Sequence, residues 1–223
     1  MAPPAVAALS PIRRRSLTQE VLGRLRQAIL SGELAEGTLL PEAQTALKLG
    51  VSRVPVREAL VELERQGLVT FDPNGRASVR AFDDEDVREL LSLRSALQTM
   101  AARHAAGRLG YADLGRLEAI LDRTAKAADL TELSRLDSAF HDEIVAIAGH
   151  RRLSRVWNDL RAQLELWLTR LHRRRNLVKH DVRRATVRAH RKMIDTLATR
   201  KPGAAGALME RHCSSWTELS PSD

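Results

Sequence analysis

The pattern of apolar and polar residues along the 223 residues of the chain is helical, except for one short β-prone segment. In the first third, apolar residues recur every three or four positions, which is the period of an amphipathic helix. This spacing predicts a helix over residues 17–30, closed by Ser31 and Gly32, and a second over residues 42–49, which stops at Gly50. A third helix is capped by Ser52 and ended by Gly67. The next segment, LVTFDPNGRASVR, has two short β-prone runs around Asn74 and Gly75 and predicts a β-hairpin. Three helices and a hairpin, with a tight turn before the third helix, are the layout of a winged helix-turn-helix.

Beyond Phe82 the pattern contains helical signals only. The segment DDEDVRELLSLRSALQTMAARHAAG begins with acidic residues, which favour a helix N-terminus, and continues as a long helix. At least five more helical segments follow, up to Leu219. The sequence therefore predicts a mainly α fold: a winged helix-turn-helix followed by an all-α helical bundle. We expect a disordered basic arm over residues 1–15, the winged domain over residues 16–82 and the helical domain over residues 83–223.

The composition agrees with helical cores in a reducing compartment. Hydrophobic residues make up 43% of the chain, yet only three Trp, one Tyr and three Phe are aromatic, so the cores must consist mostly of Leu, Ala and Val. Cys213 is the single cysteine and cannot form an internal disulfide. The N-terminal arginines follow a short apolar run, the reverse of a secretory signal, and no stretch approaches 18 apolar residues. We therefore expect a cytoplasmic protein with no membrane partner.

The net charge of +8 suggests a polyanionic partner only weakly. Residues 1–82 carry 11 Lys and Arg against 8 Asp and Glu, so the excess is spread along the chain rather than concentrated in the winged domain. Clusters such as Arg173, Arg174 and Arg175 are better interpreted as a solvated loop than as a binding patch. Evidence for nucleic-acid binding must therefore come from motifs.

One motif carries that evidence. The segment VSRVPVREAL, followed by GLV, resembles the N-terminal domain of GntR-type bacterial transcription regulators, and the resemblance covers about 60 residues. It implies a dimer that recognises a palindromic operator in double-stranded DNA. Two positions depart from the family pattern. Ala43 stands where many relatives have arginine, and Gly75 precedes Arg76 where the wing usually has Arg before Gly.

The chemistry of the motif agrees with DNA recognition. Ser52 and Arg53 lie at the start of the third helix, where free N–H groups and the helix dipole favour phosphate. Arg57 lies one turn further on, and arginine can bind guanine O6 and N7, or a phosphate, through two hydrogen bonds. Alternatively, both arginines pair with Glu58, Glu62 or Glu64 on the surface. The predicted DNA contacts are Ser52, Arg53, Val54, Pro55, Arg57, Gly75 and Arg76.

Polar residues lie where the helical domain should present apolar ones. Taking about 100° of turn per residue and Leu133 as zero, Asp137 falls at roughly 40° and His141 at roughly 80°, on the apolar face. His190 and His212 are central on the apolar faces of two later helices. One such histidine is usually a hydrogen-bonded core residue, but four polar groups buried without partners would cost several kcal/mol. A shared divalent metal removes this cost, and imidazoles with one carboxylate suit zinc, nickel, manganese or iron.

The family resemblance extends to these residues. The segments LDSAFHDEIVAIAGHRRLSRVW, AHRKMIDTL and ALMERHC resemble the helical effector domain of the FadR branch of GntR regulators, called the FCD domain. In metal-binding members, one Asp and three His form the site, and they correspond to Asp137, His141, His190 and His212. The resemblance implies a divalent metal, with zinc as the first expectation. Relatives often have Glu before the third ligand, where this chain has Ala189.

Arg94 and Gln98 extend the polar cluster. With Val87 set at zero, Arg94 falls near −20° and Gln98 near 20°, in the middle of an apolar face. An arginine in that position needs an anion, which is either an internal acidic residue or the carboxylate of a small effector. In the second case, which the family resemblance also implies, Arg94 and Gln98 bind a small carboxylate metabolite whose other oxygen occupies an open metal position.

The sequence thus predicts a homodimeric, metabolite-responsive transcription regulator, in this family most often a repressor. Effector binding would shift the population of arrangements of the helical domains and so change the spacing of the recognition helices. Two alternatives keep the DNA-binding role, with a purely structural metal or with a metal-free apolar effector. A third is a helical metallohydrolase, since three His and one Asp can activate water. It is disfavoured because no general base lies beside the ligands and a winged helix is a strange companion for a hydrolase.

Overall fold

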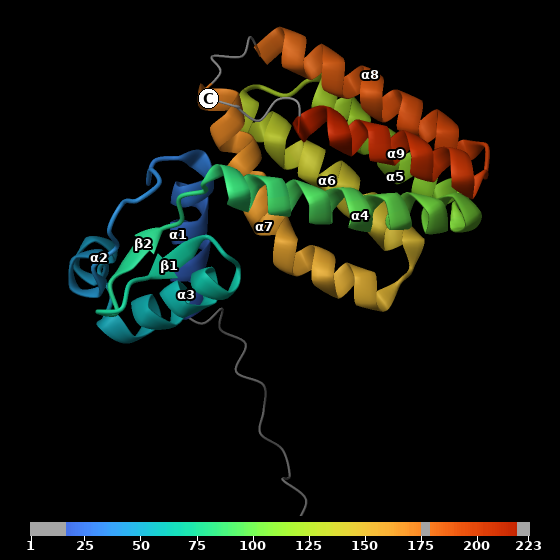
Figure 1. The fold of residues 1–223 in the computed structure, drawn as a ribbon. Helices are drawn as coiled ribbons and strands as arrows, with labels where there is room; N and C mark the ends of the chain where they lie inside the picture. The colour runs from blue at the N-terminus through green and yellow to red at the C-terminus, as the bar shows by residue number, and fades with distance from the viewer. Residues whose placement is uncertain (1–16, 175–178, 218–223) are drawn as a thin grey trace, which may run out of the picture.

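The computed structural model describes residues 17–174 and 179–217, and these form two lobes (Figure 1). The first lobe consists of α1 (Leu17–Ser31), α2 (Glu42–Leu49), α3 (Arg53–Arg65), β1 (Val69–Phe71) and β2 (Ala77–Val79). The second consists of α4 (Asp84–Arg108), α5 (Tyr111–Ala125), α6 (Leu130–Ala148), α7 (Arg151–Arg174), α8 (Lys179–Ala198) and α9 (Pro202–Thr217). The predicted mainly α fold, with a hairpin in the first lobe, is confirmed. The arm predicted over residues 1–15 lies outside the described residues, as do Arg175 and Leu219.

One apolar core holds the first lobe together. Val21, Leu25 and Ile29 recur along one face of α1, and Val56 and Leu60 of α3 are buried in the same core. The strands of the hairpin pair in antiparallel register and add to that core. This packing fixes α3 on the first lobe while leaving its other face in solvent.

The turn of the hairpin is built by its own polar residues. The Asp72 carboxylate accepts hydrogen bonds from the backbone N–H groups of Asn74 and Arg76, each at 2.9 Å. Gly75 has φ of +73°, a left-handed conformation that glycine adopts without strain. The hairpin turn expected around Asn74 and Gly75 is therefore present.

The two ends of α3 differ in part from the sequence prediction. Ser52 occupies the N-cap position, as the sequence indicates, but its side chain makes no capping hydrogen bond. At the other end, Gln66 follows the last helical residue, and Gly67 turns the chain with φ of +69°. The helix thus begins and ends where the sequence indicates, without help from the serine hydroxyl.

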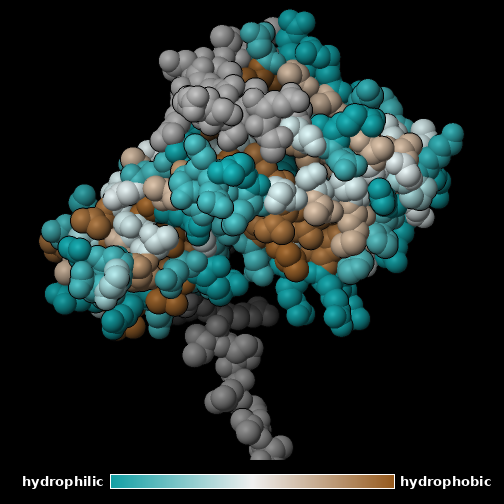
Figure 2. All heavy atoms as spheres, viewed as in Figure 1, coloured by the Kyte–Doolittle hydropathy of each residue, from teal (hydrophilic) through white to brown (hydrophobic). Residues whose placement is uncertain are grey.

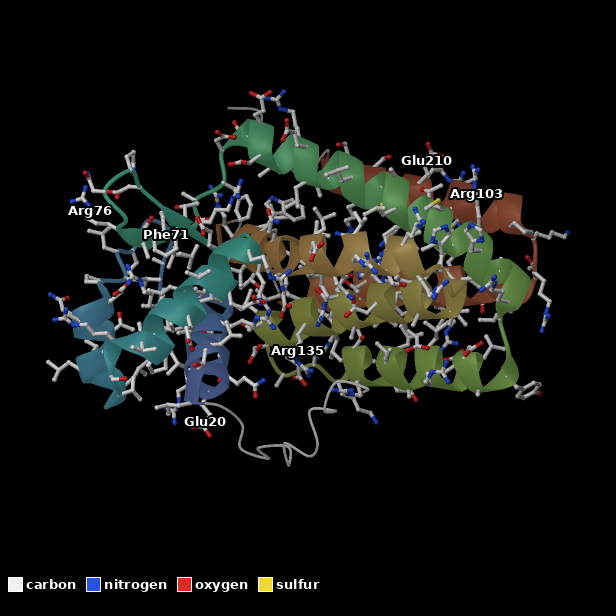
Figure 3. The ribbon with its side chains drawn as sticks, turned by 90° about the horizontal axis from the view of Figure 1, so that it is seen from below. Glu20, Phe71, Arg76, Arg103, Arg135 and Glu210 are labelled. Carbon is white, nitrogen blue, oxygen red and sulfur yellow. The ribbon has the colours of Figure 1, made fainter. Side chains whose placement is uncertain are left out.

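Helix α4 is the central element of the second lobe. It begins with a capping box, in which the Asp83 carboxylate accepts from the Asp86 N–H at 2.7 Å and the Asp86 carboxylate accepts from the Asp83 N–H at 3.3 Å. Further along, α4 packs closely against α9 through small residues, among them Ala101 and Ala205. A Cβ atom on Gly206 would lie 2.7 Å from Cγ of Arg103, so glycine lets this side chain cross α9. Figure 3 labels Arg103 near Glu210 at that end of the lobe.

Candidate metal centre

Four side chains from three helices converge in the middle of the second lobe. Asp137 and His141 lie one turn apart on α6, His190 comes from α8 and His212 from α9. One possible ligand atom from each residue can be chosen so that all four lie within 4.8 Å of one another. Asp137 is 4% exposed, His141 and His190 are each 1% exposed, and His212 is partly buried. The structure thus brings together the four residues that the sequence suggested as metal ligands.

Two distances within this cluster match the spacing of ligand atoms around one small cation, while Nε2 of His141 lies 4.0 Å from Oδ1 of Asp137. Nε2 of His190 lies 3.2 Å from Oδ1 of Asp137, and Nε2 of His212 lies 3.3 Å from Nε2 of His141. A tetrahedral zinc ion with Zn–N bonds of about 2.0–2.1 Å places neighbouring ligand atoms about 3.4 Å apart. In addition, Oδ1 of Asp137 and Nε2 of His190 are buried without a hydrogen-bond partner. Both atoms would be satisfied by coordinating a shared metal ion.

The protonation states also suit a metal. Burial, together with the positive charge of Arg94, holds the pKa of His141 well below its usual value, and burial lowers the pKa of His212 to about 3. Burial alone would raise the pKa of Asp137, but the close approach of His190, 3.2 Å away, and the positive charge of Arg94 outweigh it and lower that pKa. A carboxylate beside neutral imidazoles is the form in which these groups bind metals.

Arg94 and Gln98 reach the cluster from α4. Nη2 of Arg94 lies 3.0 Å from Nε2 of His141 and 3.5 Å from Oδ2 of Asp137, and this side chain is 3% exposed. On the other side of the ring, Nδ1 of His141 lies 3.2 Å from Oε1 of Gln98, so an Nδ1–H donates to the amide oxygen. Nε2 then accepts from the Arg94 N–H, and this is the lone pair that a metal ion would take. Gln98 lies behind His141, and its predicted contact with an effector stays a prediction.

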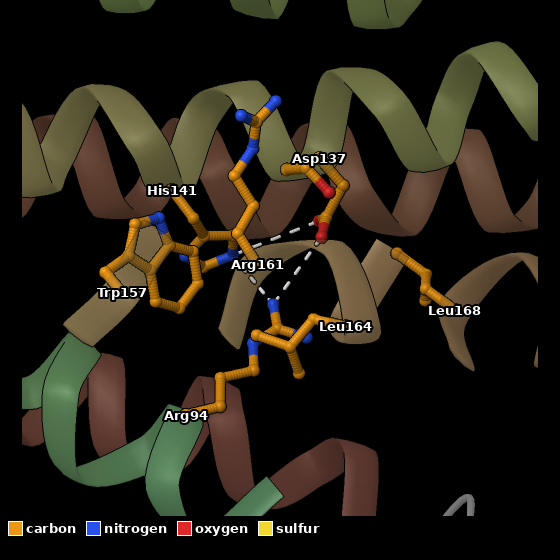
Figure 4. Close-up of a pocket in the computed structure, with 8 residues that line it drawn as sticks. Arg94, Asp137, His141, Trp157, Arg161, Leu164 and Leu168 are labelled. Atoms are coloured by element: carbon orange, nitrogen blue, oxygen red, sulfur yellow. Dashed lines mark hydrogen bonds and ion pairs between the residues drawn. The ribbon is translucent and has the colours of Figure 1, made fainter. Parts of the chain in front are cut away.

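A small cavity opens beside the cluster, between α4, α6 and α7 (Figure 4). Its volume is about 10 Å³, room for about one water molecule or ion. The cluster and α7 supply its walls, which are Arg94, Asp137, Ser138, His141, Trp157, Arg161, Leu164 and Leu168. Sequence reasoning missed the α7 residues. The signal was available, because Arg161 lies one turn from Trp157 on an apolar face, as Arg94 does on α4.

The predicted DNA contacts of the first lobe divide into exposed and buried residues. Arg53 and Arg57 are exposed on α3, and Val54 is 65% exposed. Nε of Arg57 lies 3.3 Å from Oε1 of Glu42 on α2, an ion pair that differs from the three pairings considered from the sequence. Pro55, in contrast, is buried in the first turn of α3, so its side chain packs in the core instead of facing a ligand.

The hairpin presents the remaining predicted contacts. Gly75 and Arg76 are exposed at the tip of the hairpin, and Figure 3 shows Arg76 at its outer end. Nε of Arg76 donates to Oδ2 of Asp72 at 2.7 Å. This pair is on the surface, so a phosphate could replace the carboxylate at little cost.

None of the described helices has both the length and the apolar character needed to span a bilayer.

Two family models match the chain: "Bacterial regulatory proteins, gntR family" over residues 17–79 and "FCD domain" over residues 89–215. An uncharacterized HTH-type transcriptional regulator of Streptomyces ambofaciens is 33% identical over 89% of this chain and 82% of its own length. A gluconate operon transcriptional repressor of Bacillus licheniformis is 29% identical over 76% of this chain and 71% of its own length.

Solved structures show the same fold. A GntR transcriptional regulator from Rhodococcus sp. RHA1 has a TM-score of 0.75 at 25% identity, covering 90% of this chain and 95% of that one. E. coli McbR/YncC has a TM-score of 0.78 at 20% identity, covering 92% and 97% of the two chains. The relatives are transcription regulators, which removes the metallohydrolase alternative. The chain therefore belongs to the GntR family of bacterial transcriptional regulators, with a GntR DNA-binding domain followed by an FCD domain.

Proposed function

We propose that this regulator is a cytoplasmic homodimer and a repressor that binds a palindromic operator and responds to a divalent metal and a small carboxylate. The observation that supports the metal best is the convergence of four ligand atoms, from the buried Asp137, His141 and His190 and the partly buried His212. One carboxylate and three imidazoles suit zinc first, and nickel, manganese or iron as alternatives. When bound, the metal would supply a positive centre that orders the pocket and offers an open position to an anion.

The carboxylate effector is inferred from the charge of Arg94. Its guanidinium lies 3.0 Å from Nε2 of His141, so it stands next to the place where a metal ion would bind. Asp137 lies 3.5 Å from Arg94, so the internal acidic partner considered from the sequence is present. Its single negative charge would not balance both a divalent metal ion and the guanidinium, so a further anion is favoured. The carboxylate of an effector, held by Arg94 beside the metal, would provide that anion. The relative named for a gluconate operon is compatible with this class of effector, since gluconate is a carboxylate.

DNA binding is assigned to α3 and the hairpin. The exposed Arg53 and Arg57 would face the major groove, while Arg76 would contact the adjacent backbone. A palindromic operator requires two such helices, hence two copies of the chain.

A second copy has a suitable surface on the helical lobe. Figure 2 shows an apolar area where α4 and α7 lie side by side. Leu93 and Met100 of α4 are 51% and 37% exposed, Leu97 lies between them on the same face, and Val156 of α7 is 51% exposed. In a dimer with a two-fold axis through this surface, the apolar area of each chain would be buried against the same area of the other chain.

Metal analysis tests the proposal most directly. Protein purified without chelators or a nickel column, and then reloaded with zinc, should contain about one zinc per chain, while the Asp137→Asn and His190→Ala variants should contain little. The matched control is His104→Ala, because His104 is exposed and lies outside the cluster. Less than half an equivalent in the reloaded wild type would refute the metal site. Full zinc with no effect of any carboxylate on operator binding would favour the purely structural metal.

A further inference from the structure

Helix α7 presents two sets of side chains on opposite sides. The α7 residues that line the cavity lie within about 40° of Trp157 at about 100° of turn per residue: Arg161, Leu164 and Leu168. A second set falls roughly 200–240° from Trp157 at the same pitch: Asp159, Gln163 and Arg170. One side of α7 thus faces the metal centre, and the other side faces the first lobe.

The second set meets the end of the recognition helix α3. Nη1 of Arg65, the last residue of α3, lies 3.5 Å from Oδ1 of Asp159, although both side chains are more than half exposed and the pair contributes little alone. Closer packing occurs at Gly67, where an added Cβ would lie 2.4 Å from Cδ of Gln163. The turn that ends α3 therefore rests directly on α7, and Figure 1 shows α7 running alongside the first lobe.

Arg170 makes the most buried of these contacts. Its Nη1 donates to the backbone oxygen of Phe82 at 2.8 Å and lies 3.1 Å from Oε1 of Glu36. The Arg170 and Glu36 side chains are 18% and 20% exposed, so solvent screens this pair less than the one at Arg65. Phe82 immediately precedes Asp83, the capping residue of α4. Arg170 thus joins α7 to the α1–α2 loop and to the connection between the lobes.

The cavity is too small for a carboxylate ligand unless one of its walls moves. Its volume of about 10 Å³ holds about one water molecule, whereas a carboxylate group is larger. The walls supplied by α4 and α6 are tied together by Arg94, His141 and Gln98. On the α7 side, Trp157 and Arg161 both contact Asp142 of α6, at 2.6 Å and 2.8 Å, and the Arg161 and Asp142 side chains are 43% and 29% exposed. Because α4 and α6 are joined by fully buried groups, whereas α7 is joined to α6 at a partly exposed edge of the cavity, the α7 wall is the one expected to move.

We propose that α7 transmits ligand binding at the metal centre to α3, and that Arg170 is the positioning residue that makes the first lobe follow α7. This rests on the proposed metal and carboxylate site. Without Arg170, the centre should still bind its ligands, but the first lobe should no longer respond to them.

The test is hydrogen exchange on the full chain, free of metal or with zinc and acetate. In the wild type, zinc with acetate should slow exchange in residues 137–168 and change it about fivefold or more in residues 32–40 and 62–72, the lower end of ordinary coupling. Arg170→Ala should bind zinc with an affinity within about threefold of the wild type. It should keep the slower exchange in residues 137–168 but lose the change in residues 32–40 and 62–72. Arg170→Lys, which keeps the charge facing Glu36, should restore part of the change in residues 32–40 and 62–72.

The controls separate coupling from folding. Arg155→Ala removes an exposed arginine of α7 and should behave as the wild type. Glu36→Gln removes only the charge of the partner and should weaken the response even if Arg170→Ala fails to fold. An unchanged response in residues 62–72 of Arg170→Ala, or of Glu36→Gln where Arg170→Ala does not fold, would overturn the role of Arg170. Zinc binding in the wild type with no change in those residues would overturn transmission through α7. Failure of the wild type to bind zinc by calorimetry would instead overturn the metal site itself.

Discussion

Asp137→Asn should strongly destabilise the metal-free protein. The substitution keeps the shape of the side chain but removes the charge that faces Arg94, at a site where the two side chains are 3% and 6% exposed. Removing one partner of a buried ion pair typically costs about 3–5 kcal/mol, because the remaining charge stays buried without compensation. For a chain of this size, that cost corresponds to a decrease in Tm of about 6–20 °C.

Asp142→Asn is the matched control. Asp142 accepts a hydrogen bond from Nε1 of Trp157 at 2.6 Å and pairs with Arg161, whose side chain is 43% exposed. An asparagine can still accept from the tryptophan, so this substitution should cost no more than about 1 kcal/mol.

The assay is urea and thermal unfolding in the presence of a chelator, at one fixed protein concentration because a dimer unfolds in a concentration-dependent way. The double variant Arg94→Met/Asp137→Asn should recover most of the lost stability, since no unpaired charge remains. The reasoning is wrong if Asp137→Asn costs no more than Asp142→Asn, or if the double variant is less stable than Asp137→Asn alone.

Three further changes test other parts of the molecule. Gln98→Leu should leave the zinc stoichiometry unchanged but weaken affinity about 10- to 100-fold in calorimetry, because the orientation of His141 is lost; unchanged affinity would contradict that role. Arg57→Ala should abolish specific operator binding, measured by fluorescence anisotropy, with the dimer still folded; wild-type affinity would refute the assignment. Leu93→Asp should shift sedimentation from dimer to monomer, and an unchanged dimer would place the interface elsewhere.

The sequence predicted most of the fold and the ligand cluster for a simple physical reason. Helical periodicity determines which side chains face a core, so a polar residue such as His190 stands out on an apolar face by its spacing alone. The same periodicity marks Arg161 on α7. Tertiary pairings such as Arg57 with Glu42 lie beyond periodicity, because they depend on how two helices cross.

Two local details at α3 do not follow from residue type. Ser52 has the right identity and position for a helix cap, but only its backbone takes part, because a propensity does not fix a rotamer. Pro55 is a family motif residue, and its burial shows that it shapes the first turn of α3 without an exposed side chain. Motif membership alone therefore cannot separate residues that contact a ligand from residues that support them.

A metal ion held by the histidines of the cluster would connect segments that lie far apart along the chain. His141 and His212 are separated by 71 residues, and a shared metal would close that whole segment into a loop. Because these residues come together only in the folded chain, free metal at about 100 times its Kd would stabilise the fold by about 2.7 kcal/mol. Proteases act on opened chains, so the lifetime of the regulator in the cell would itself follow metal supply. The abundance of this regulator would then report on metal as directly as its affinity for DNA does.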